Sequence, residues 1–229
     1  LYLPLRELTK SGGTFEDNTT YSNTATALNK AITGLKAHNS SYSIKSGTLA
    51  ETAGKKTVAG GWWHKKDYEN QMWLDGAYMG PALFAELVNY SGKTTNIDSS
   101  NDWDLIVKQF TILRNMCWNP TDKLPYHAFA ADGGTNSTSH SDTWAGLSST
   151  SPYVFHSASY WGRAVGWYFL ALVDILEQME KANLTSTDGY KTLKGYLAET
   201  ADGLKARQDK TTGGWYQILD KDGTYSASE

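Results

Sequence analysis

The chain has 229 residues, enough for one large domain or two small ones, with a formal net charge of −3. Its 21 basic residues are outnumbered by 24 acidic residues and form no cluster, so no nucleic-acid partner is expected. The longest apolar run, residues 167–176, is interrupted by Asp174 and falls well short of the roughly 20 residues that span a bilayer, so no membrane association is expected.

Amphipathic helical patterns dominate the chain. Apolar residues at positions 25, 28, 31, 32 and 35 have the spacing of a helix over residues 21–39. Pro81 in a first turn and Gly92 past the last turn favour a helix over residues 80–92. Similar patterns predict the end of a helix at residues 1–9 and further helices at residues 101–119, 159–183 and 188–209. Two stretches rich in Gly, Ser and Thr, residues 42–72 and 119–156, predict functional loops or short strands.

A faint internal repeat suggests how the helices are arranged. The sequence GGWWHK at residues 60–65 returns as GGWYQI at residues 213–218. In two related segments a tryptophan precedes a charge by two residues: Trp73 before Asp75, and Trp161 before Arg163. This rhythm predicts helical hairpins in a ring, with the charged loops gathered at one end.

Asp75 is the first candidate for chemistry. A carboxylate at a helix start is favoured by the helix dipole, which is a purely structural explanation. Its aromatic neighbours, including Trp73, also predict partial burial, which raises the pKa of a carboxyl group and suits it to donating a proton near neutral pH.

Arg163 is the opposite case, because a cation at a helix start opposes the dipole. An anion should therefore lie nearby, either Asp75 or a carboxylate of the substrate. Trp167 follows four residues later on the same helix face, so the pair suits an acidic sugar.

Three further residues could line the same site. His127 lies between aromatic residues in LPYHAF, and His64 and Lys65 directly follow two tryptophans. A structural role is the simpler explanation for a lone histidine. No HExxH motif, cysteine–histidine spacing or phosphate loop occurs, so no metal and no cofactor is expected. Cys117, the only cysteine, is predicted to be a buried core thiol.

Four segments in order resemble one enzyme family: GGWWHKKDYENQMWLDGAYMG, LPYHAF, SASYWGRAVGWYFLALVDIL and TGGWYQILDKDGTYSASE. They are similar to the unsaturated rhamnogalacturonyl hydrolases of glycoside hydrolase families 88 and 105, with the related unsaturated glucuronyl hydrolases. The resemblance implies an all-α (α/α)6 barrel, a toroid of six helical hairpins. We expect residues 1–229 to be a single domain that holds only the central part of this barrel, truncated at both ends.

The resemblance also implies an activity and a site. The substrate would be an oligosaccharide released by a lyase, from whose non-reducing end a Δ4,5-unsaturated uronic acid, of galacturonyl type, is removed. The WLDG aspartate, here Asp75, would protonate the vinyl ether and then help water to add. His127, Arg163 and Trp167 would line the sugar site, with His64, Lys65 and Trp73 beside them.

The sequence departs from the family pattern in two places. A second family aspartate would fall before Leu1, outside this chain. Ala130 stands where relatives often carry an acid, and Asp132 is the candidate to replace it.

Two other interpretations stay open. One is a polysaccharide lyase on a helical toroid, with Tyr126 or His127 as base and Arg163 neutralising charge. The other is a non-catalytic carbohydrate-binding fragment. No signal peptide is expected, and the sequence does not decide between the cytoplasm and a periplasmic or secreted location.

Overall fold

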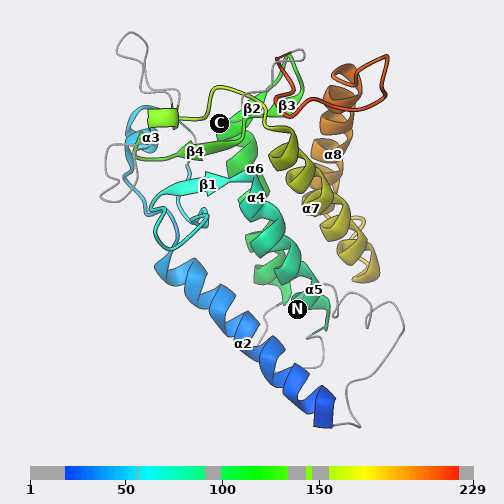
Figure 1. Ribbon diagram of the computed structural model, residues 1–229. Coiled ribbons are helices and arrows are strands. Elements are labelled where there is room, and N and C mark those ends of the chain that lie inside the picture. The colour runs from blue at the N-terminus through cyan, green and yellow to red at the C-terminus, as the bar shows by residue number, and fades with distance from the viewer. Residues whose placement is uncertain (1–18, 56, 91–98, 134–142, 146–154, 222–229) are drawn as a thin grey trace.

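A computed structural model describes residues 19–55, 57–90, 99–133, 143–145 and 155–221. Helices make up most of this part of the chain (Figure 1), and the predicted helix end at residues 1–9 lies outside it. The helices are α2 (Thr19–Ser41), α3 (Leu49–Thr52), α4 (Leu74–Ala77), the π-helix η1 (Tyr78–Ala82), α5 (Leu83–Tyr90), α6 (Ser99–Cys117), the 3₁₀ helix η3 (Thr143–Ala145), α7 (Gly162–Lys181) and α8 (Asp188–Ala206). The strands are β1 (Gln71–Trp73), β2 (Trp118–Asn119), β3 (Leu124–Pro125) and β4 (Ala128–Ala130).

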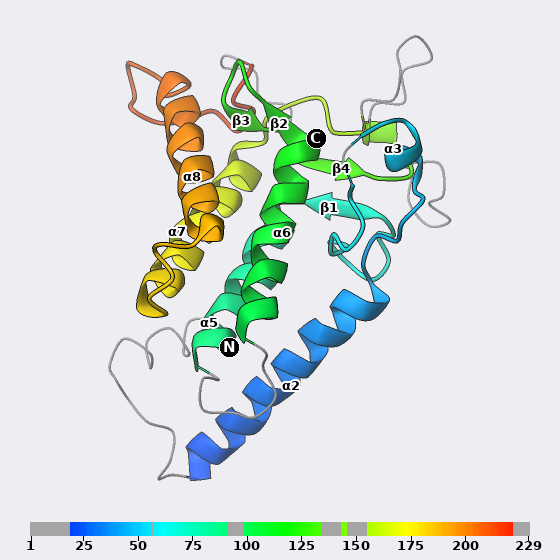
Figure 2. The same cartoon turned by 180° about the vertical axis from the view of Figure 1, so that it is seen from behind.

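The long helices pack side by side, and the strands gather at one end of the packed helices (Figures 1 and 2). Helix α7 contacts α8, α4 and α5, while α6 contacts both α5 and α8. The first turns of α4 and α7 lie at the end where the strands are. The sequence repeat therefore predicted correctly that the two charge-bearing helix starts lie together.

Asp75 lies in the first turn of a helix, as predicted. This helix begins at Leu74 and runs through α4, η1 and α5 to Tyr90, so the separate start expected at residue 80 was wrong. Pro81 lies inside the π-helix. Proline cannot donate the usual backbone hydrogen bond, but a wider turn accommodates it within a helix. The first turn is anchored from outside, because the Leu74 N–H donates to the carbonyl oxygen of His127 at 3.0 Å.

The two stretches predicted as functional loops or short strands, residues 42–72 and 119–156, carry short strands. Strand β1 pairs antiparallel with β4, with Trp73 opposite Ala128 and Gln71 opposite Ala130. Since Asp75 follows β1 by two residues and His127 directly precedes β4, this register brings their backbones to the same end of the sheet.

A continuous apolar core joins the helices to the strands. Phe84, Phe110, Phe129 and Tyr168 are among its fully buried side chains. Cys117 is also fully buried, which confirms the predicted core thiol, and burial raises its pKa. None of the helices in the described ranges is long and apolar enough to cross a membrane.

Candidate active site

Asp75 occupies the first turn of α4, with Trp73 at the N-cap. Its side chain is 8% exposed, so most of the carboxylate is withdrawn from water. The free N–H groups of a helix start favour a negative charge in this position. A side chain this buried needs further hydrogen-bond partners, and two cationic or ionisable groups supply them.

His127 and Arg163 each bond one oxygen of this carboxylate. His127 Nε2 lies 3.0 Å from Oδ2, and Arg163 Nε donates to Oδ1 at 3.1 Å. Arg163 holds the same position in α7 as Asp75 holds in α4, because each helix has a tryptophan at its N-cap. The Arg163 side chain is 49% exposed, so its remaining N–H groups are open to a ligand.

The ionisation of Asp75 differs from the sequence-based expectation. Burial by itself raises the pKa of this carboxyl, as expected. The hydrogen bond and charge of His127, together with Arg163, outweigh burial and lower the pKa below its ordinary value. The expectation of a raised pKa was therefore wrong, because it counted the apolar neighbours and missed the two partners.

An aromatic stack flanks the carboxylate. The ring of Trp73 lies parallel to that of His64, with centroids 4.7 Å apart, and also stacks on Tyr68 at 5.3 Å. The His127 ring contacts Trp73 in an edge-to-face arrangement, with ring centroids 5.1 Å apart. Burial lowers the pKa of His64 to about 4, so this imidazole is neutral at physiological pH.

The described contacts of Lys65 and Trp167 are with aromatic rings near the carboxylate-bearing helix. Lys65 is exposed, with its Nζ 4.9 Å from the centroid of the Tyr68 ring. Trp167 packs against Tyr78, with ring centroids 4.6 Å apart. Direct contact with Asp75 is therefore described for His127 and Arg163, and the aromatic stack links His64, Trp73 and Lys65 to them.

The residues predicted from the sequence did not include two aromatic residues that the structure places here. Trp161 stacks on His127 at 6.2 Å and lies under the Arg163 guanidinium at 5.8 Å. Its place two residues before Arg163, matching Trp73 before Asp75, was the available signal. Tyr68 joins the stack from a loop, and no pattern in the sequence marks it.

Asp132, the candidate to replace the acid missing at Ala130, lies just after β4. Pairing of β1 with β4 puts Ala128 next to Trp73, and the chain then runs away from Asp75 through Ala130. Asp132 is buried two residues beyond the far end of that pairing. That Asp132 replaces the acid of the relatives stays a prediction.

A cavity of about 190 Å³ opens beside the aromatic stack. His64, Trp73, Gly76 and Met79 are among the residues that line it, so it shares the stack and the first turns of the Asp75 helix. Asp75, His127 and Arg163 are not part of its lining. The described residues include no group of three metal-ligating side chains. The site thus combines one buried carboxylate, two cationic or ionisable partners and aromatic surfaces.

Comparison with known proteins identifies the family. The sequence profile of Glycosyl Hydrolase Family 88 matches residues 35–229, which include all seven of the predicted site residues. The chain belongs to Glycosyl Hydrolase Family 88. This confirms the resemblance found in the sequence.

Solved structures place the fold of this family 88 chain. A glycoside hydrolase of family 105 from C. acetobutylicum ATCC 824 is 30% identical over 70% of this chain and 39% of its own, with a TM-score of 0.57. A possible family 105 member from Klebsiella pneumoniae subsp. pneumoniae MGH 78578 is 17% identical over 96% and 45%, with a TM-score of 0.60. Another from Salmonella enterica subsp. enterica serovar Paratyphi A str. ATCC 9150 is 20% identical over 86% and 47%, with a TM-score of 0.55.

The family 88 chain thus spans less than half the length of these structures. Such proteins are helical toroids, so the all-α prediction is confirmed and the described helices correspond to part of a ring.

Proposed function

We propose that this chain carries the catalytic centre of an unsaturated uronyl hydrolase, which removes a Δ4,5-unsaturated uronic acid from the non-reducing end of an oligosaccharide. The observation that carries the proposal is the Asp75 carboxylate, held by His127 and by a half-exposed Arg163, in a family 88 chain. A galacturonyl-type sugar is the favoured substrate. Residues 1–229 are proposed to form a single domain.

The proposed reaction hydrates the vinyl ether of the substrate. Protonated Asp75 gives its proton to C4, and positive charge develops at C5 and the ring oxygen. Water then attacks C5 while the Asp75 carboxylate takes one of its protons, which restores the acid. The hemiketal that forms opens and releases the remaining sugar. One water is consumed, and Asp75 ends in the state in which it began.

Substrate binding should shift Asp75 toward the protonated form that this reaction needs. His127 and, after it, Arg163 lower the pKa of Asp75 against the effect of burial. A uronyl carboxylate competes for the exposed guanidinium, whose planar N–H groups suit a carboxylate. When Arg163 turns to the substrate, burial of Asp75 counts for more, and its pKa rises. In the complex Asp75 is thus the acid, and Arg163 is the group that binds the substrate carboxylate.

The aromatic stack and the cavity support a sugar ligand. Trp73 and Trp161 supply half-buried aromatic rings beside His127, and the cavity next to Trp73 gives room beside the Asp75 helix. We place the substrate among these residues, with His64 and Lys65 on the Trp73 side and Trp167 on the Arg163 side.

A polysaccharide lyase is less well supported. A tyrosine base must reach the substrate, whereas the Tyr126 ring is stacked on those of His156 and Tyr160, with centroids 4.0 and 4.6 Å away. His127 is bonded to Asp75, which favours assistance to a carboxyl acid over direct attack on a sugar C–H.

Absorbance of the unsaturated sugar tests the proposal. A hydrolase removes the chromophore from lyase-derived disaccharides, whereas a lyase creates it from polysaccharide. Asp75→Asn should lower turnover by roughly 10²- to 10⁴-fold while binding stays measurable. Asp104→Asn, the same change at an exposed aspartate of α6, should leave turnover unchanged. Rates within a few-fold of wild type in Asp75→Asn would remove Asp75 from the reaction.

A further inference from the structure

The two groups that hold Asp75 come from distant parts of the chain, yet the residues next to them are in contact. Tyr126 directly precedes His127, and Tyr160 lies just before the helix that begins with Gly162 and Arg163. The rings of Tyr126 and Tyr160 stack with centroids 4.6 Å apart and planes inclined by 27°. This stack therefore ties the backbone at His127 to the backbone that leads into Arg163.

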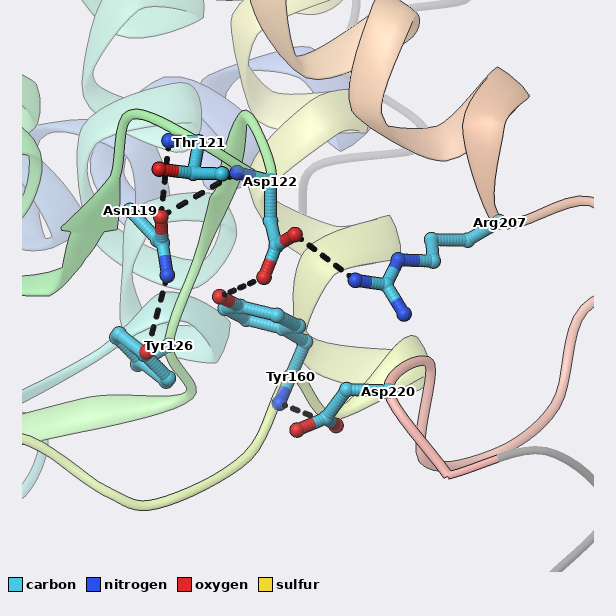
Figure 3. Close-up of polar contacts among 7 residues, drawn as sticks. All are labelled: Asn119, Thr121, Asp122, Tyr126, Tyr160, Arg207 and Asp220. Carbon is cyan, nitrogen blue, oxygen red and sulfur yellow. Dashed lines mark hydrogen bonds and ion pairs between the residues drawn. The ribbon is translucent and has the colours of Figure 1, made fainter.

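Tyr160 is fixed at its hydroxyl as well as at its ring. It is 1% exposed, and its hydroxyl donates to Asp122 Oδ2 at 2.7 Å (Figure 3). The other oxygen of Asp122 accepts from Arg207, at the end of α8, at 2.9 Å. One carboxylate thus joins the turn between β2 and β3, the segment before α7 and the end of α8.

The backbone around Tyr160 is also held. Its N–H donates to Asp220 Oδ1 at 3.2 Å, and its carbonyl oxygen accepts from the Leu219 N–H at 2.9 Å. The N–H of Gly162 donates to the Gln217 carbonyl oxygen at 2.7 Å. The first turn of α7, which presents Arg163, therefore starts from a fixed platform.

Tyr126 is held from its own side. Its N–H donates to the Cys117 carbonyl oxygen at 2.7 Å, and its hydroxyl accepts from Asn119. Its ring also stacks on His156, with centroids 4.0 Å apart and planes inclined by 8°. Movement of Tyr160 would disturb a residue that is otherwise locked directly beside His127.

We propose that Asp122, Tyr126, Tyr160 and Arg207 form a clamp that fixes the spacing between His127 and Arg163 and so positions both against Asp75. No contact between a clamp residue and Asp75 is described, so these are positioning residues that act through their chain neighbours. A hydrogen bond tolerates displacement of only a few tenths of an ångström, so small shifts of the platform weaken the bonds to Asp75.

Asp75 itself reports on the clamp. The titratable and charged groups described around it are His127, Arg163 and His64. If His127 and Arg163 drift away, the interactions that lower the pKa of Asp75 weaken while its burial remains. Loosening the clamp should therefore raise this pKa, whether or not the protein has the proposed activity.

The test compares Tyr160→Phe and Asp122→Ala with wild type in the full chain. The pKa of Asp75 is followed by carbon-13 NMR of its carboxyl, with the signal identified by its loss in Asp75→Asn. Tyr190→Phe is the matched control, because this buried tyrosine also donates to a carboxylate, Glu180, at 2.6 Å. Thermal unfolding of each variant shows whether the two tyrosine changes destabilise the protein equally.

A higher pKa of Asp75 in both clamp variants, with no change in the Tyr190→Phe control, supports the clamp. An unchanged pKa in a folded Tyr160→Phe protein overturns it. The kinetic readout rests on the proposed function: kcat should fall roughly 10- to 100-fold in Tyr160→Phe and stay at the wild-type value in Tyr190→Phe. If wild type removes no chromophore but the pKa still shifts, the proposed function fails and the clamp stands.

Discussion

The half-buried, neutral imidazole of His64 makes the stability of this protein sensitive to mild acid. Its imidazole stacks on Trp73, and burial lowers its pKa from 6.5 to about 4. In the unfolded chain the same group titrates at its ordinary value. Between these two values the unfolded chain binds a proton that the folded chain does not. Stability is therefore fully present above pH 6.5 and is lost progressively as the pH falls toward 4.

The size of the loss follows from the difference between the two pKa values. Each pKa unit corresponds to about 1.4 kcal/mol. At pH 5 the uptake of this proton by the unfolded chain therefore lowers the free energy of unfolding by about 2 kcal/mol. Partial access of water to the ring reduces this to about 1.5 kcal/mol. For a chain of this length the melting temperature should fall by roughly 3 to 6 °C from this source.

Replacement of His64 by phenylalanine isolates the effect. The variant keeps an aromatic ring against Trp73 but has nothing to protonate, so its stability should fall less between pH 7 and pH 5. Urea unfolding at the two pH values gives the loss of unfolding free energy for each protein, and the two losses are then compared. Burial also lowers the pKa of His156, but this group titrates in both proteins and cancels. Equal losses in wild type and His64→Phe would show that His64 is not held neutral by the fold.

Two other perturbations test the packing and the site. Gly203→Ala in α8 would place a methyl group 2.8 Å from the carbonyl oxygen of Asp122 and closer still to that of Lys123, so we expect a loss of about 1 to 3 kcal/mol in urea unfolding. In Gly195→Ala, in the same helix, the added methyl group meets nothing within 4 Å, so this change should stabilise the protein by up to about 1 kcal/mol. Equal effects of the two substitutions on stability would contradict the close approach at Gly203. Arg163→Gln should raise KM for an unsaturated uronyl disaccharide by at least roughly tenfold, because a charge-assisted hydrogen bond to the carboxylate is lost, and unchanged KM would exclude Arg163 from that contact.

The helices were largely predictable because their signal is local. Apolar spacing located the helices observed at Thr19–Ser41, Ser99–Cys117 and Asp188–Ala206 within a few residues. The pattern around Pro81 indicated a separate helix start at residue 80, because proline is typical of a first turn. In the structure Pro81 lies inside a π-helix, and the helix start is anchored by the carbonyl oxygen of His127, far away in sequence.

For the site, the sequence alone determined which residue types occur and which helix starts carry them. The matching positions of Asp75 and Arg163, each two residues after a tryptophan, can be read from the order of residues. The same order indicates that Arg163 needs a nearby anion, either Asp75 or a substrate carboxylate. Only the tertiary structure decided that His127 completes the pair and that the pKa of Asp75 is lowered. Periodicity depends on neighbours three or four residues apart, whereas a pKa depends on every charge within a few ångströms, wherever the fold has brought it from.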